Sequence, residues 1–402
     1  MLWLIQMNAN PPLAAIYPAA GDRVPQVRRL VVLRANAVGD FVVALPALAA
    51  LRHAYPRAHI TLLGRRWHAE FLQNRPGPVD EVIELPDVPG VTVPPQAEVD
   101  AAALAAFVAR MRARQIDLAL QLHGGGRYSN RFLLQLGARV SAGLRAPDAA
   151  ALDRNLDYLD DHHPVTLQLL ECVALVGATV AGIEPRLQLR PQDLVEAERL
   201  LPPDGQPLVV LQPSATDPRR RWHPGGFAAV GDALAARGAR IVLNGSADDV
   251  AVNRAVVAAM RSPALDLAGR LSIGGLCAVL ARARLLVSND TGPLHLARAL
   301  DTPTVAVYWI GNVRSFGPLS TSRHRVAVSW RMHCVLCGRH CMQDDCDHVE
   351  SLVDDVPADT VREMAEALYA CASEALLLAV KPLQTVRSRP RAAPGAAAWV
   401  SV

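Results

Sequence analysis

Short apolar runs bounded by polar residues alternate along the chain with longer stretches in which apolar residues recur every three or four positions. The first pair is the run 30–33 and the stretch 41–54. A strand buried on both faces is apolar throughout and a helix is apolar on one face, so this alternation predicts a parallel sheet covered by helices. In the first half we predict strands at 30–33, 60–63, 81–85, 118–122 and 140–143, helices at 41–54, 98–113 and 165–176, and surface loops at 87–95 and 146–164.

A second series of the same kind opens after residue 190. We predict strands at 208–211, 240–243, 265–267, 283–287 and 303–307, and helices at 192–201, 225–236, 273–281 and from 246. Two such series predict an α/β protein of two doubly wound, Rossmann-like domains that face each other across a cleft. The predicted layout is a loose N-terminal extension over 1–28, a first domain over 29–188, a second domain over 189–375 and a disordered tail over 376–402.

Composition agrees with a globular chain of more than one domain. The sequence has 402 residues, of which 51% are hydrophobic, and a domain typically takes about 150 residues. The net charge of +3 gives no sign of the basic stripe of a nucleic-acid-binding protein. Only one of the 41 basic residues, Lys381, is a lysine, so any single arginine carries little information.

The sequence predicts no targeting or membrane-spanning segment. The apolar start 1–5 lacks preceding positive charge, and Asn8, Asn10 and Pro11 interrupt it before a signal-peptide core is complete. No stretch is both long and apolar enough to span a bilayer. We therefore expect a cytoplasmic protein, in which the seven cysteines are thiols or metal ligands rather than disulfides.

A candidate anion-binding site lies where a predicted strand of the second domain gives way to a helix. Asp290 or Thr291 fits the N-cap position of that helix, and Pro293 fits its first position. The backbone N–H groups of Thr291, Gly292 and Leu294 are therefore expected to point out of the helix start, where the helix dipole favours a phosphate. The alternative is that these residues only start a helix.

The first domain has a carboxylate at a comparable place. Gly39 and Asp40 lie between a predicted strand and the N-terminus of the next helix. Open α/β sheets bind ligands at this edge, where a carboxylate can act as a general base. The alternative is that Asp40 is the N-cap of the helix.

Polar residues follow two further strands predicted in the second domain. Ser214 and Thr216 come after the strand 208–211, and their hydroxyl groups are candidates to donate to a phosphate. Asp249 follows the next strand, where a carboxylate can accept the hydroxyls of a ribose. Ser246 and Asp249 also form an imperfect capping box, which is the alternative explanation for this carboxylate.

Four cysteines share one short segment that also contains histidines. Cys334 and Cys337 are separated by two residues, and Cys341 and Cys346 follow at longer spacings. This set is compatible with a tetrahedral structural zinc site, although the longer spacings fit no standard zinc ribbon. The alternative is that the thiols are reduced and unligated.

Several motifs follow one another in a recognisable order. They are Gly39-Asp40 with Leu45-Pro46-Ala47-Leu48, a basic residue two positions before Trp222, Gly269-Arg270-Leu271, Asp290-Thr291-Gly292-Pro293 with His295, and Gly317-Pro318-Leu319. In these motifs the chain resembles glycosyltransferase family 9, the ADP-heptose:lipopolysaccharide heptosyltransferases, over about residues 29–368.

The resemblance implies the GT-B architecture of two Rossmann-like domains. It also implies an inverting transfer of heptose from ADP-heptose to a saccharide of the lipopolysaccharide core, with no metal or other cofactor required for catalysis. The first domain would bind the acceptor and the second the donor. Peripheral contact with the inner face of the inner membrane fits such an acceptor.

The same resemblance implies roles for individual residues. Asp40 would be the general base, and Arg220 would neutralise the charge of the departing diphosphate, although the family often has lysine at that position. Leu271 would form the floor of an adenine pocket, and Asp290 and His295 would belong to the donor site. The alternatives are a solvated basic loop around Arg220 and a packed histidine at 295.

Two other functions stay open at this stage. One is a GT-B enzyme that uses another nucleotide sugar, because elements that bind a diphosphate read no base. The other is a catalytically inactive scaffold stabilised by the cysteine segment. The sequence does not specify the acceptor sugar.

Overall fold

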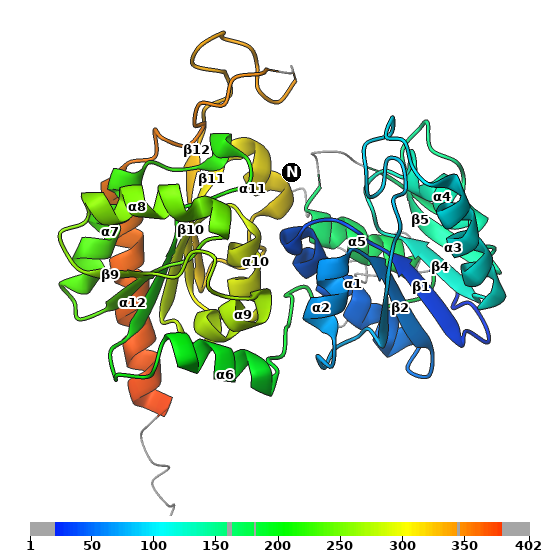
Figure 1. Cartoon of the computed structure of the whole chain (residues 1–402), viewed down its shortest axis with the longest axis horizontal. Helices are drawn as coiled ribbons and strands as arrows, with labels where there is room; N and C mark the ends of the chain where they lie inside the picture. Colours follow the sequence, from blue (N-terminus) through cyan, green and yellow to red (C-terminus); the bar gives the residue numbers. More distant parts are fainter. Residues whose placement is uncertain (1–20, 159–162, 181, 344–345, 380–402) are drawn as a thin grey trace, which may run out of the picture.

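The computed structural model describes residues 21–158, 163–180, 182–343 and 346–379. This part of the chain forms two six-stranded sheets that lie side by side, each between layers of helices (Figure 1). The first sheet has the order β3-β2-β1-β4-β5-β6. Its strands are β1 (Arg29–Leu33), β2 (His59–Gly64), β3 (Glu81–Glu84), β4 (Leu118–Gln121), β5 (Val140–Arg145) and β6 (Arg154–Asp157).

The second sheet has the order β12-β11-β10-β7-β8-β9 and repeats the first, with β7 in the place of β1 and β10 in the place of β4. Its strands are β7 (Leu208–Gln212), β8 (Arg240–Leu243), β9 (Ala264–Asp266), β10 (Leu285–Asn289), β11 (Thr304–Trp309) and β12 (His324–Ser329). All neighbouring strands are parallel. This is the Rossmann order, so the predicted α/β fold of the GT-B type is confirmed.

Helices cover both faces of each sheet. In the first they are α1 (Val38–Ala54), α2 (Arg66–Leu72), α3 (Ala101–Ala113), α4 (Ser129–Gln135) and α5 (Val165–Ala174). In the second they are α6 (Pro191–Leu200), α7 (Pro224–Ala235), α8 (Val250–Ala259), α9 (Ile273–Arg282), α10 (Gly292–Ala299), α11 (Ile310–Phe316) and α12 (Ala358–Ala379). The α1 and α5 layer faces the α9 and α10 layer, and one apolar core runs through both (Figure 1).

The central strand β1 is apolar from Leu30 to Leu33 because both of its faces are buried. Leu30 and Val32 pack in the core shared with α1 and α5, whereas Val31 and Leu33 pack on the opposite face with α3 and α4. Successive side chains of a strand point to opposite faces, and both faces are covered here. The central strands therefore present no polar side chain until they end, and the polar residues that follow them gather at one edge.

Three details of the predicted layout are wrong. Residues 21–28, expected in a loose extension, pack on the first domain, where the Gly21 N–H donates to the Ala174 carbonyl over 2.9 Å and Val24 is buried. The segment 146–164, expected as a loop, contains β6. The helix α12 continues to Ala379, into the predicted tail.

Residues 1–20 and 380–402, where the rest of the extension and of the tail were predicted, lie outside the described residues. Among the described helices, none is long and apolar enough to cross a membrane.

Candidate active site

The two sheets meet at the starts of the helices that follow their central strands. A Cβ atom on Gly39, in the first turn of α1, would lie 2.8 Å from Cδ2 of His295 on α10. A Cβ atom on Gly292 would lie 3.2 Å from the Cβ of Val38. In each sheet the strand order reverses between the two central strands, β1 and β4 in the first sheet and β7 and β10 in the second. Open α/β sheets bind ligands at such a switch point, beyond the carboxyl ends of the strands.

Asp290, directly after β10, is the centre of a buried polar cluster. Its carboxylate accepts a hydrogen bond from Asn312 over 2.9 Å and lies 3.3 Å from Nη1 of Arg220 and 3.5 Å from Nε2 of His295. Burial raises the pKa of the Asp290 carboxyl, but the hydrogen bond of His295 and the charge of Arg220 outweigh burial and lower it. Asp290 is therefore ionised and holds three nitrogen groups around its carboxylate.

Arg298 fixes the tautomer of His295. Nη1 of Arg298 lies 3.5 Å from Nδ1 of His295. A guanidinium can only donate, so Nδ1 accepts and the proton of a neutral ring lies on Nε2, facing Asp290. This arrangement places His295 in the polar cluster, as the family resemblance implies.

Arg220 is the only member of the run Arg219, Arg220 and Arg221 that reaches Asp290 within the described structure. The short helix η2 (Pro218–Arg220) begins after Asp217, whose carboxylate pairs with Arg219 at 2.8 Å. Arg221 donates instead to the carbonyl of Ala215 over 2.8 Å. Nε of Arg220 is buried without a hydrogen-bond partner among the described residues, so it can still donate to an anion.

The start of α10 differs in two respects from the prediction. Thr291 is its N-cap residue, and Pro293 is the second residue of the helix rather than the first. The Leu294 N–H donates to the Thr291 carbonyl over 3.1 Å, so the expectation that this N–H points outward is wrong. The helix start that faces the first domain is therefore formed by Thr291 and Gly292.

Asp40 is the third residue of α1, and its predicted alternative role as the N-cap is wrong because Ala37 occupies that position. The helix begins earlier than the periodicity indicated. Buried Arg34 donates through Nε to the Asp40 carbonyl over 2.8 Å, and its Nη2 lies 3.3 Å from Oδ1 of Asp40. Burial lowers the pKa of Arg34 and the charge of Asp40 raises it. The Asp40 side chain remains 29% exposed, so it is accessible to solvent beside the contact between the domains.

The other predicted donor-site residues lie along the same edge of the second sheet. Ser214 is buried and accepts a hydrogen bond from Gln212 over 2.6 Å, whereas Thr216 is exposed. Asp249 accepts from both the backbone N–H and the hydroxyl of Ser246, each over 2.7 Å, so the capping box is present. Its carboxylate is therefore already engaged in local structure.

Leu271 lies next to this loop and is partly buried. The preceding turn has Gly269 at φ +68°, and the Gly269 N–H donates to the Gly245 carbonyl over 2.9 Å. A Cβ on Gly269 would lie 3.0 Å from Cα of Ala247, so a larger residue would separate the two loops. The turns after β8 and β9 thus join into one continuous surface beside Asp249.

Four further residues of the cluster and its surroundings were not predicted from the sequence: Arg34, Asn289, Asn312 and Arg298. Asn289 accepts from the Trp222 N–H over 3.1 Å and donates to the Pro213 carbonyl over 2.7 Å, which fixes the arginine loop beside β10. Arginine is too common in this chain for Arg34 or Arg298 to be noticed. Asn312 lies on α11, a helix that the periodicity did not predict.

The cysteine segment brings together a different set from the one predicted. Ligand atoms of Cys334, Cys337, Cys346 and His348 lie within 4.8 Å of one another. Cys341 is not in this group, and its Sγ donates to the Arg339 carbonyl over 3.7 Å. The prediction of Cys341 as a ligand is therefore wrong for this geometry.

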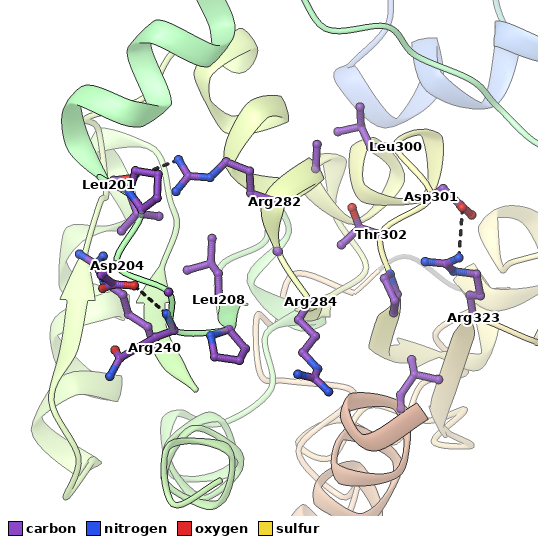
Figure 2. A pocket seen from close by; sticks show the side chains of 18 of the residues that line it. Leu201, Asp204, Leu208, Arg240, Arg282, Arg284, Leu300, Asp301, Thr302 and Arg323 are labelled. Atoms are coloured by element: carbon purple, nitrogen blue, oxygen red, sulfur yellow. Dashed lines mark hydrogen bonds and ion pairs between the residues drawn. The ribbon is translucent and has the colours of Figure 1, made fainter. Parts of the chain in front are cut away.

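A cavity of 890 Å³ opens at the amino-terminal ends of the strands of the second sheet, opposite the end that carries Asp290 (Figure 2). Pro207, just before β7, and Arg240, the first residue of β8, lie in its walls. Figure 2 shows Arg240 paired with Asp204 at 2.7 Å, and Arg323 paired with Asp301 at 3.2 Å. No residue of the Asp290 cluster lines this cavity, so its arginines act in local structure rather than at the cleft.

Two Rossmann-like domains in contact, with the Asp40 carboxylate on one side of that contact and the Asp290 cluster on the other, have the architecture of the GT-B glycosyltransferases. The sequence model of glycosyltransferase family 9 (heptosyltransferase) matches residues 104–342, more than half of the chain. The protein belongs to this family.

Named relatives agree with this assignment. Lipopolysaccharide heptosyltransferase 2 of Salmonella typhimurium is 24% identical over 357 residues, which are 85% of this chain and 98% of the relative. Lipopolysaccharide heptosyltransferase 3 of Escherichia coli is 36% identical over 107 residues, which are 26% of this chain and 32% of the relative.

Solved structures show the same fold. The ADP-heptose lps heptosyltransferase II of E. coli matches with a TM-score of 0.68 and 20% identity, over 86% of this chain and all of that one. A family 9 glycosyltransferase from Veillonella parvula matches with a TM-score of 0.70 and 20% identity, over 85% of this chain and 97% of that one.

Proposed function

We propose that this glycosyltransferase transfers heptose from ADP-heptose to a saccharide of the lipopolysaccharide core, with inversion at the anomeric carbon. The observation that carries the proposal is the cluster of Arg220, Asp290 and His295, which lies against the turn of Asp40 across the domain contact. The names of the relatives support the sugar and the acceptor class, and a solved relative is described as holding ADP.

In the proposed reaction an acceptor hydroxyl attacks the anomeric carbon while Asp40 takes its proton. The bond from that carbon to the diphosphate oxygen breaks, and ADP leaves with the bonding electrons. Arg220 neutralises the charge that grows on the diphosphate. A metal ion performs this function in other enzymes, so the proposed mechanism requires no metal ion. Attack from the face opposite the diphosphate inverts the configuration.

The donor base is tested by ligand-induced stabilisation. A nucleotide that binds only the folded protein raises the melting temperature, and we expect ADP to do so more than UDP or GDP at equal concentration. Incubation with ADP-heptose and a heptose-deficient core saccharide should then yield the extended product and ADP. A larger shift with UDP or GDP would indicate another nucleotide sugar, and the absence of any shift or product would support an inactive scaffold.

The membrane contact expected from the acceptor is also a proposal, together with a cytoplasmic location. The cysteine segment extends away from the body of the second domain (Figure 1), and Trp330, Leu336 and Val349 are 71%, 60% and 61% exposed. Because these exposed side chains are apolar, we expect contact through them rather than through lipid charge. Trp330→Ala should reduce sedimentation with neutral and anionic vesicles alike, and no sedimentation of the unaltered protein would refute this contact.

A further inference from the structure

The four side chains at the tip of the cysteine segment have the spacing of ligands around one small ion. Sγ of Cys346 lies 3.2 Å from Nδ1 of His348 and 3.5 Å from Sγ of Cys337. Sγ of Cys334 lies 3.6 Å from the same nitrogen. Zinc bonds of about 2.0 to 2.3 Å give a tetrahedron whose edges are about 3.3 to 3.8 Å. These three separations are close to those edges, and all four ligand atoms lie within 4.8 Å of one another.

The backbone of the segment brings these groups together. The Gly338 N–H donates to the Cys334 carbonyl over 2.9 Å, which closes a turn around the first two cysteines, and Gly338 has φ +72°. The Cys334 N–H donates to the Arg339 carbonyl over 2.9 Å, so the two arms of the turn pair. The Cys337 and Cys346 sulfurs at 3.5 Å are too far apart for a disulfide bond of about 2.05 Å.

We propose that Cys334, Cys337, Cys346 and His348 bind one Zn²⁺ ion. Thiolate sulfur and imidazole nitrogen are the donors that zinc prefers, and four protein ligands leave no open position for substrate. The ion would therefore have a structural role. Reduced and unligated thiols leave this convergence without an explanation, because none of the four groups lies in an apolar core cluster.

The zinc site is connected to the loop that carries Arg220. After His348 the chain returns to this loop, where the Leu352 N–H donates to the Arg219 carbonyl and the Ser351 hydroxyl donates to the Arg221 carbonyl, both over 2.7 Å. Arg331, at the other end of the segment, donates to the Ser351 carbonyl over 2.9 Å.

Zinc would close the segment between these two ends and so fix the residues on both sides of Arg220. We infer that it supports donor binding from a distance. This second step rests on the proposed function, whereas the metal site does not.

The metal site is tested by elemental analysis of the untagged, full-length protein. We expect about one zinc per chain, and loss of most of it in Cys337→Ser and His348→Ala. Cys341→Ser is the matched control, since it removes a thiol of the same segment that lies outside the cluster, and it should retain the zinc. A chain without zinc, equal loss in Cys341→Ser, or a Cys337 to Cys346 disulfide in the isolated protein would overturn the site.

Cobalt substitution gives a second test that needs no variant. Co²⁺ in the unaltered protein should show the intense visible bands of a tetrahedral ion with thiolate ligands. Bands typical of an octahedral ion would contradict the proposed ligand set even if variants of the ligands fail to fold.

The connection to Arg220 is tested by removing zinc with a chelator and measuring ADP affinity and amide hydrogen exchange. We expect ADP to bind severalfold more weakly and the amides of 219–221 to exchange faster, with both restored by added zinc. Zinc at full occupancy with unchanged ADP affinity after its removal would refute the connection and leave the site in place. Failure of the zinc-loaded protein to bind ADP would refute the proposed donor and leave the metal result unaffected.

Discussion

At the scale of single residues, the candidate site contains an ion pair between Arg220 and Asp290, and a bound diphosphate would compete with Asp290 for Arg220. Asp290 is almost fully buried, and Arg220 is its nearest cation. A buried carboxylate without a partner is costly, so Asp290 also needs Asn312 and His295 if a diphosphate draws Arg220 away. Because three nitrogen groups surround this carboxylate, the cluster around Asp290 can stay intact with or without a bound nucleotide sugar.

Arg220→Ala should weaken ADP binding by about ten- to a hundredfold, because a hydrogen bond to an ionised partner contributes roughly 1.5 to 3 kcal/mol. Turnover should fall further, since charge grows on the diphosphate towards the transition state. Calorimetric titration with ADP and steady-state kinetics measure the two effects. Arg219→Ala and Arg221→Ala are matched controls, because both side chains are engaged elsewhere. If a control weakens ADP as much as Arg220→Ala, the clamp is not Arg220.

Asp40→Asn should lower turnover by about two to four orders of magnitude and leave ADP affinity nearly unchanged, as expected for a general base on the acceptor side. The amide keeps the shape and can still accept from Arg34, so the local fold should survive. Asp100→Asn is the control, because Asp100 caps α3 away from the domain contact. Turnover of Asp40→Asn within a fewfold of the unaltered enzyme would remove Asp40 from the role of base.

At the scale of elements, the site depends on two helix starts that approach closely because both carry glycine. Neither Gly39 nor Gly292 has a positive φ, so each is needed for space rather than for backbone conformation. The tighter contact is that of Gly39 with the His295 ring. Since Nε2 of His295 lies 3.5 Å from Asp290, the position of α1 is linked to the cluster around Asp290.

Gly39→Ala should therefore displace His295 or part the domains, and we expect turnover to fall by about ten- to a hundredfold, the usual effect of a misplacement near 1 Å. Gly292→Ala meets Val38 at 3.2 Å and should have a smaller effect. Gly77→Ala is the control, since nothing lies within 4 Å of its added methyl group. Equal turnover in Gly39→Ala and Gly77→Ala would show that this contact is unimportant for catalysis.

The predictable elements are those with a long apolar signal. The runs at 30–33 and 208–211 identified the central strands, because both faces of these strands are buried. The strand β6 escaped detection because its sequence, Arg154-Asn-Leu-Asp157, is largely polar and lies at the edge of the sheet. The helix α11 has only seven residues and no buried residue, so it carries no periodic signal.

Site residues, like helices and strands, could be predicted only where the sequence carries a local pattern. Asp40, Arg220, Asp290 and His295 were found because they follow central strands or belong to motifs with recognisable order. Asn312 could not be found, because it reaches Asp290 from α11. His348 was overlooked in favour of Cys341, since spacing along the chain does not show which side chain a turn directs inward.

At the scale of the whole molecule, one buried histidine and one partly buried histidine make the fold sensitive to acid. Burial lowers the pKa of His68 from 6.5 to about 3, and that of His123 from 6.5 to about 4. Each accepts a backbone hydrogen bond through Nδ1, His68 from Arg65 over 3.0 Å and His123 from Ala35 over 3.2 Å. Protonation would abolish both hydrogen bonds and place charge in a buried site at His68 and a partly buried site at His123, so the folded state favours the neutral rings.

Because these pKa values are lower in the folded chain, the unfolded chain binds more protons below about pH 6.5, and stability falls as the pH decreases from there towards 4. For His68 alone, a change from pH 7 to pH 5 should remove about 2 kcal/mol of unfolding free energy. Melting temperatures measured across this range should fall less steeply in His68→Asn, which keeps a hydrogen-bond acceptor but does not titrate. The exposed His53 on α1 provides the control, and His53→Asn should keep the original slope. If all three proteins show the same slope, His68 is protonated in the folded state and the argument from burial fails.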